Sequence, residues 1–139
     1  MKYEIEKIIN RIKSGGKNSF IEKASEKAIE AFEKNNNFKL PIQYKEWLLF
    51  SDGGEIYLPA GIQLYGVEHK PLIDINDIDK PGDDYIVVGA LATGDLIVCK
   101  NGEEKIAIYN REAARIEDDE IYDDFSSFLE DLDNIVDVG

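Results

Sequence analysis

Apolar residues in the first third of the chain recur at helical spacing. Isoleucines at positions 5, 8, 9 and 12 fall on one face of a 3.6-residue repeat, and Gly15-Gly16 follows them. This pattern predicts a helix over about 2–14. A second stripe predicts a helix over about 25–36, which either Ser19 or Ser25 can cap and which the asparagines at 35–37 end. The residues of this second stripe are Ala24, Ala28, Ala31 and Phe32.

A third helix is predicted over about 41–52. Proline suits its first turn, where a missing N–H leaves no intrahelical bond unmade. Trp47 can be an exposed anchor for a partner or a core residue, and the apolar face that it shares favours the core. The residues that we expect to build this helix and the turn after it are Pro41, Tyr44, Trp47, Leu48, Gly53 and Gly54.

Beyond residue 54 the apolar period changes from 3.6 to about two, which predicts antiparallel strands. The expected strands cover 55–58, 62–67, 85–89, 96–99 and 105–109. The continuous apolar run at 85–89 indicates a central strand that is covered on both faces. Asn101-Gly102 predicts a type I′ hairpin turn, because both residues readily adopt positive φ.

The remaining segments complete a single domain over residues 1–139. Residues 68–84 read as a loop in which Ile73, Ile75 and Ile78 fix a short helical turn to the core. Apolar spacing that includes Phe128 predicts a closing helix over about 125–136. The order of N-terminal helices, a mainly antiparallel or mixed sheet and a C-terminal helix indicates an α+β domain.

Charge narrows the classes of partner. The formal net charge is −13, yet residues 1–50 hold ten bases and seven acids, whereas residues 51–139 hold six bases and 22 acids. A chain this acidic repels phosphate, so we expect neither nucleic acid nor a membrane surface as a partner. No apolar run reaches the length of a bilayer span and no signal peptide is apparent, so we expect a cytoplasmic protein. The asymmetry can steer a basic partner or simply maintain solubility.

The residues that could carry chemistry form no recognisable catalytic or cofactor site. Cys99 lies in an apolar run and is the only cysteine, and His69, the only histidine, is thirty positions away, so we expect neither a disulfide nor a Cys/His nucleophile. Gly89 and Gly94 have P-loop spacing, but Asp95 replaces the lysine that would contact phosphate. We expect the two glycines to serve turns and close packing, and Asp95 to bond local backbone N–H groups.

Acidic residues elsewhere suggest no metal site. Asp74, Asp77 and Asp79 lie close together, but they lack the glycine and terminal glutamate of an EF-hand loop. A hydrolase with paired carboxylates remains an alternative, although no spacing selects a pair. We therefore expect no catalytic residue, no metal and no cofactor.

The densest run of charge lies near the C-terminus, with six carboxylates in eight residues. Such a run is either a solvated face or a patch that imitates a phosphate backbone and captures a basic cleft. Tyr109, Ile121 and Tyr122 are close enough in sequence to supply apolar anchors. The candidate partner-binding residues are Glu117, Asp118, Asp119, Glu120, Tyr122, Asp123 and Asp124.

Five segments in order resemble one family. Leu40-Pro41-x-x-Tyr44-Lys45-x-Trp47-Leu48-Leu49-x-Ser51-Asp52-Gly53-Gly54-Glu55 is similar to the signature of the SMI1/KNR4, or SUKH, family. Later matches, which extend the resemblance over roughly residues 22–133, are Leu64-Tyr65-Gly66, Tyr85-Ile86-Val87-Val88-Gly89, Gly94-Asp95 and Ser127-Phe128-Leu129-Glu130-Asp131-Leu132.

The resemblance implies an α+β fold and no established enzymatic activity. Bacterial members of this family are commonly immunity proteins that bind and block toxin domains, often nucleases, whereas eukaryotic members are regulatory or scaffold proteins. The resemblance therefore implies a protein-binding domain whose partner is a basic toxin domain, blocked by occlusion of its active site. A regulatory scaffold with a non-toxin partner is the alternative.

Overall fold

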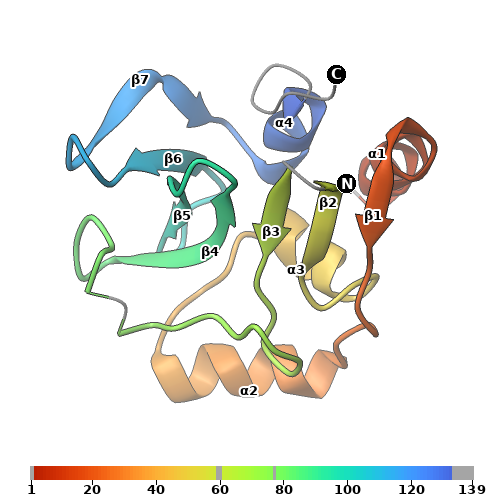
Figure 1. The fold of residues 1–139 in the computed structure, drawn as a ribbon. Coiled ribbons are helices and arrows are strands. Elements are labelled where there is room, and N and C mark those ends of the chain that lie inside the picture. Colours follow the sequence, from red (N-terminus) through yellow and green to blue (C-terminus); the bar gives the residue numbers. More distant parts are fainter. Residues whose placement is uncertain (1, 59–60, 77, 133–139) are drawn as a thin grey trace.

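The computed structural model describes residues 2–58, 61–76 and 78–132. These residues form four helices and one seven-stranded sheet, so the expected α+β class is confirmed (Figure 1). The helices are α1 (Lys2–Gly15), α2 (Glu26–Asn36), α3 (Ile42–Leu48) and α4 (Phe125–Glu130). The strands are β1 (Lys17–Ser19), β2 (Gly54–Leu58), β3 (Ile62–Leu64), β4 (Tyr85–Leu91), β5 (Leu96–Lys100), β6 (Ile106–Asn110) and β7 (Arg115–Tyr122).

The sheet is an antiparallel meander in which each strand pairs with the next one along the chain. Within the described ranges, parallel pairing is limited to an isolated bridge between Gly66 and Leu72. The two edge strands, β1 and β7, were not predicted from the sequence. In Figure 1, α1 and β1 lie at one end of the molecule and β7 lies at the other.

Several predicted boundaries require correction. The helix expected over 41–52 ends at Leu48, because the residues after it turn sharply into β2, and the strand expected over 62–67 ends at Leu64. Ser25 caps α2 by accepting a hydrogen bond from the N–H of Ala28 at 3.1 Å, which settles the choice between the two serines. Helix α4 ends at Glu130, Leu132 is again helical, and residues 133–136 of the expected helix lie outside the described residues.

The turn at Asn101-Gly102 is not type I′. Gly102 has a φ of +78°, but Asn101 does not have positive φ, and the N–H of Glu103 donates to the carbonyl of Lys100. The side chain of Asn101 is committed elsewhere, because its Oδ1 accepts from the N–H of Lys39 at 2.7 Å. The hairpin therefore holds the segment that leads into α3. Contacts to a distant segment have overridden the local turn preference.

The main core lies between the helices and one face of the sheet. Trp47 and Phe128 are both fully buried there, as their apolar faces predicted, so Trp47 is not an exposed anchor. The opposite face of β4–β6 carries a second, smaller cluster, which is covered in part by half-buried tyrosines. The central strand is therefore buried on both faces, as predicted. The members of the second cluster are Val87, Leu96, Val98 and Ala107.

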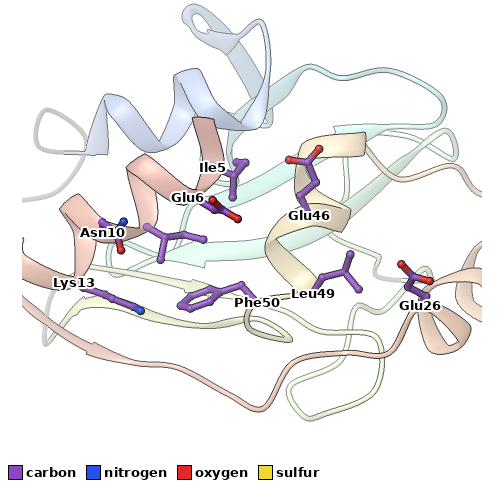
Figure 2. A pocket seen from close by; sticks show the side chains of 9 residues that line it. Ile5, Glu6, Asn10, Lys13, Glu26, Glu46, Leu49 and Phe50 are labelled. Carbon is purple, nitrogen blue, oxygen red and sulfur yellow. The ribbon is translucent and has the colours of Figure 1, made fainter. Parts of the chain in front are cut away.

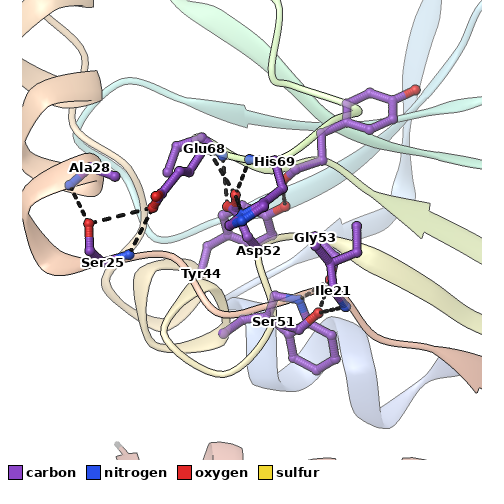
Figure 3. A network of polar contacts seen from close by, with 12 residues as sticks. Ile21, Ser25, Ala28, Tyr44, Ser51, Asp52, Gly53, Glu68 and His69 are labelled. Atoms are coloured by element: carbon purple, nitrogen blue, oxygen red, sulfur yellow. Dashed lines mark hydrogen bonds and ion pairs between the residues drawn. The ribbon is translucent and has the colours of Figure 1, made fainter.

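A buried carboxylate joins the end of α3 to the loop after β3 (Figure 3). Asp52 is fully buried, and its oxygens accept hydrogen bonds from the backbone N–H groups of Val67, Glu68 and His69, the first two at 2.8 Å. The ring Nδ1 of His69 lies 3.0 Å from Asp52 Oδ2. A buried carboxylate needs several donors of this kind to offset its lost hydration. These bonds fix the loop against α3, and we call them the Asp52 network.

The family-like residues around Asp52 complete this junction. Trp47 Nε1 and the Ser51 hydroxyl both donate to the carbonyl of Gly53, at 3.0 and 2.8 Å. Tyr44 donates its hydroxyl to the carbonyls of Tyr65 and Val88, and burial raises the pKa of that hydroxyl well above its ordinary value. Gly53 has a φ of +99°, and a Cβ there would lie 2.5 Å from the Leu64 carbonyl oxygen. Only glycine fits that position.

Truncation of the buried aromatic residues tests the main core. Trp47→Ala and Phe128→Ala should each lower the free energy of unfolding by about 3–5 kcal/mol, because both side chains are fully enclosed. Leu49→Ala is the control, since that neighbouring side chain is 37% exposed and should cost about 1 kcal/mol or less. Urea denaturation measures all three, and similar losses for Trp47→Ala and Leu49→Ala would contradict the assignment.

A second prediction concerns the Asp52 network. Asp52→Ala should lower the free energy of unfolding by about 3–5 kcal/mol, because three backbone N–H groups lose their acceptor. His69→Ala keeps the backbone N–H and should cost about 1 kcal/mol or less. Chemical denaturation of the pair separates the two contributions. Equal losses would mean that the imidazole, rather than the loop backbone, carries the stabilisation.

Candidate functional site

The acidic run at 117–124 begins on the exposed edge strand of the sheet and ends at the start of α4. In its register with β6, Ile121 lies opposite Ala107 and Ile116 lies opposite Tyr109, so β7 advances five positions while β6 advances two. The intervening residues 117–120 therefore bulge out of the ladder. Asp118 and Asp119 are exposed on this bulge. The bulge displays consecutive carboxylates that regular pairing would alternate between the two faces.

The turn between β4 and β5 adds a further carboxylate to this region. The pKa of Glu120 is raised, first by partial burial and then by the negative charges of Asp119, Asp95 and Glu117. Asp95 was expected to bond local backbone N–H groups, but its carboxylate makes no such bond with the described residues. Its charge instead acts on Glu120, across the sheet. We define the acidic face as Asp95, Glu117, Asp118, Asp119, Glu120 and Asp123.

Three of the residues predicted to bind a partner also have structural roles. Glu117 forms an ion pair with Arg115 at 2.7 Å. Asp124 caps α4, where its Oδ1 accepts from the N–H of Ser127 at 2.8 Å. Tyr122 donates its hydroxyl to Asp131 at 2.8 Å, and its ring packs edge-on against a core phenylalanine. Asp118, Asp119 and Asp123 are the exposed carboxylates of the run.

Apolar groups border the acidic face. Ile121 is 44% exposed and shares a face of the sheet with its partner Ala107. Tyr109 is half-buried over the second cluster on the same face. A mainly polar depression of about 480 Å³ opens beside Asp95; Tyr109 and Ile78 line it together with the charged side chains of Asp79, Lys80, Arg111 and Glu112. Acidic and apolar surface are therefore contiguous here.

Ile78 is the clearest correction among the predicted core residues. Ile73 is buried and Ile75 is half-buried against the core, but Ile78 is 96% exposed. The next residue, Asp79, forms an ion pair with Arg111 at 3.3 Å, which ties this loop to the end of β6 rather than to the helices. The 68–84 loop thus presents an isoleucine to solvent at the edge of the depression. Apolar periodicity alone could not reveal this, because the same spacing also suits a buried turn.

The glycines at P-loop spacing do not form a phosphate loop. Gly89 lies within β4, where an added Cβ would approach the carbonyl oxygen of Gln63 to 2.4 Å. Gly94 lies in the β4–β5 turn, beside Asp95. The spacing reflects close packing between strands followed by a turn.

The described part of the chain shows no group built for metal or thiol chemistry. No set of three or more His, Cys, Asp or Glu side chains within it could hold a metal ion, while Asp77 of the expected cluster lies outside that part. Cys99 is buried, and burial raises the pKa of its thiol. Within residues 2–58, 61–76 and 78–132, no helix combines the length and apolar character needed to cross a bilayer.

Comparison with known families gives one match. The sequence model of the SMI1 / KNR4 family (SUKH-1) matches residues 23–131, which include the Asp52 network and the whole acidic face. No curated protein matches the chain.

The crowding of carboxylates at Glu120 has a measurable consequence. Because its pKa is higher in the folded chain than in the unfolded chain, stability falls as pH rises through the interval between the two values. Glu120→Gln cannot ionise, so it should unfold at higher urea concentration than the wild type at pH 7, and this gain should shrink as the pH is lowered through the carboxyl range.

Glu30→Gln is the matched control for this measurement, because that exposed carboxylate lies on α2, outside the acidic face, and its charge does not act on Glu120, so its neutralisation should give little gain. Equal stabilisation by both variants at pH 7 would show that net charge, not the position of Glu120, sets the effect.

Proposed function

The chain belongs to the SMI1/KNR4 (SUKH-1) family, and we propose that it is an immunity-type protein-binding domain that neutralises a toxin with a basic surface. Membership in this family supports a protein-binding role. The observation that carries the finer proposal is the acidic face, where an edge-strand bulge and a neighbouring turn bring carboxylates together at one end of the molecule.

The acidic face suits a partner that normally binds a polyanion. Consecutive carboxylates on the bulge present a series of negative charges, as a phosphate backbone does, so a basic cleft of a nuclease would attract them. Exposed Ile121 and Ile78 offer apolar contacts beside the charges, and such contacts slow dissociation after encounter. Binding in this orientation would occlude the active site without any chemistry by this chain.

The first experiment identifies the partner. The chain is co-expressed with the product of each directly adjacent gene, and both cell survival and co-purification are measured. Survival together with a stable complex supports an immunity role. A complex with a non-toxin protein, without protection, would favour the regulatory scaffold instead.

The kinetic prediction uses the captured toxin domain as the partner. Replacing Asp118, Asp119 and Asp123 by asparagine should slow association several-fold at low salt and change dissociation little, because long-range charge acts on encounter. The difference should fade near physiological ionic strength, where screening shortens the reach of charge to about 8 Å. Glu117 and Asp124 are left intact because they form an ion pair and a helix cap.

The matched control removes the same number of charges elsewhere, at the exposed residues Glu22, Glu30 and Glu130. Its association rate should remain close to that of the wild type. If both triple variants slow association equally, the effect comes from net charge, and the acidic face is only a solvated surface. Surface plasmon resonance across a salt series measures both variants.

A further inference from the structure

A second candidate surface lies at the opposite end of the molecule, in a groove between α1 and α3 (Figure 2). Its volume of about 630 Å³ is within the range of sites that hold several side chains of a ligand. None of its lining residues belongs to the acidic face. The lining residues are Ile5, Glu6, Ile9, Asn10, Lys13, Glu26, Glu46, Leu49 and Phe50.

The floor of the groove is apolar and held in place. Ile5 and Ile9 of α1 belong to the main core, so their positions are set by packing beneath the groove. The Phe50 ring packs edge-on against Trp47, with centroids 5.4 Å apart, and against Phe20, with centroids 5.0 Å apart. Leu49 adds a side chain that is 37% exposed at the rim. A partner would therefore meet a preformed apolar surface, which lowers the entropy cost of binding.

The rim of the groove is acidic, although residues 1–50, which supply it, carry a net positive charge. Glu6, Glu26 and Glu46 line it, although residues 1–50 contain more bases than acids. Overall acidity therefore does not account for three glutamates around one groove. The single lysine of the lining, Lys13, has its Nζ 5.1 Å from the centroid of the Phe50 ring. The rim is thus net negative, and an aromatic face of the floor already accommodates a cation.

We propose that this groove binds a segment of a partner protein in which apolar and cationic side chains are adjacent. The apolar side chains pack on Phe50 and Leu49, and an arginine or lysine on either side of them pairs with Glu6 or with Glu26, which lie on opposite sides of these two residues in Figure 2. Charge complementarity selects this occupant over an acidic or purely apolar one. The proposal is independent of the toxin-neutralising function, since it uses other residues at the other end of the fold.

The test uses a capped synthetic tetrapeptide with the sequence arginine, leucine, leucine, arginine. It is titrated into the ¹⁵N-labelled full chain, and backbone amide shifts are followed by NMR. We expect saturable shifts at Ile9, Leu49 and Phe50. Two control peptides, with glutamates replacing the arginines or serines replacing the leucines, should shift these amides at least about fivefold less at equal concentration.

Variants of the chain then separate the two contributions. Glu6→Gln with Glu26→Gln should weaken binding about three- to tenfold, as expected for two exposed charge pairs. Leu49→Ala should weaken it about fivefold through lost apolar contact. Ile42→Ala is the matched control, because that residue is also exposed on α3, at 46%, but does not line the groove. The control should bind like the wild type.

Three results would overturn the proposal. Equal shifts with the serine peptide would show charge attraction alone, and shifts confined to β7 would place the peptide on the acidic face. A concentration-dependent dimer that Leu49→Ala dissociates in analytical ultracentrifugation would identify a second copy of the chain as the occupant. Each result leaves the toxin-binding experiment unaffected, so the two proposals fail separately.

Discussion

The fold depends on a carboxylate that is placed where water cannot reach it. Burying Asp52 costs several kcal/mol unless its oxygens are bonded, and the loop after β3 supplies the donors. The loop benefits as well. Because β3 ends at Leu64, the N–H groups at 67–69 have no strand partner, and the Asp52 carboxylate accepts their hydrogen bonds instead. The loop then reaches α2, where the carboxylate of Glu68 accepts from the N–H of Ser25. The side chains of Asp52 and Glu68 thus connect the loop after β3 to both α3 and α2.

The helices cover one face of the sheet. On the opposite face of β4–β6, side chains of the strands themselves form the second cluster. The sheet continues to β7, and among the described residues its far face carries a small cluster that packs against half-buried side chains, three tyrosines among them. As an edge strand, β7 exposes unpaired backbone groups that invite pairing with another chain. The bulge and its carboxylates oppose such pairing, and the same carboxylates form a negative surface. Under the proposed function, the carboxylates that oppose edge pairing are also the ones that attract a basic partner.

Periodicity recovered most elements of the fold, but it missed what depends on distant contacts. The spacing of the isoleucines in α1 and the apolar run of β4 were enough to predict that these residues are buried. The pattern of β7 was hidden, because consecutive carboxylates at the bulge break its alternation. Asp52-Gly53 read only as a turn, since nothing local indicates that the carboxylate reaches a loop fifteen residues away. The acidic run at 117–124 was visible in the sequence because its residues are consecutive. The sequence did not show that Asp95, in a turn far along the chain, adds its charge to this run.

The residues that identify the family say little about the partner, and burial explains why. Tyr44, Trp47 and Asp52 are all fully enclosed, so none of them can touch a bound protein. They are required for the junction between helix and sheet, whichever surface the fold presents. The acidic face and the glutamates at the rim of the α1–α3 groove lie outside this junction and can change without disturbing it, whereas Phe50 on the groove floor packs against Trp47. The shared motifs therefore predict the fold of a family member but not its partner. The partner must be inferred from the charged and apolar residues that are exposed on each protein.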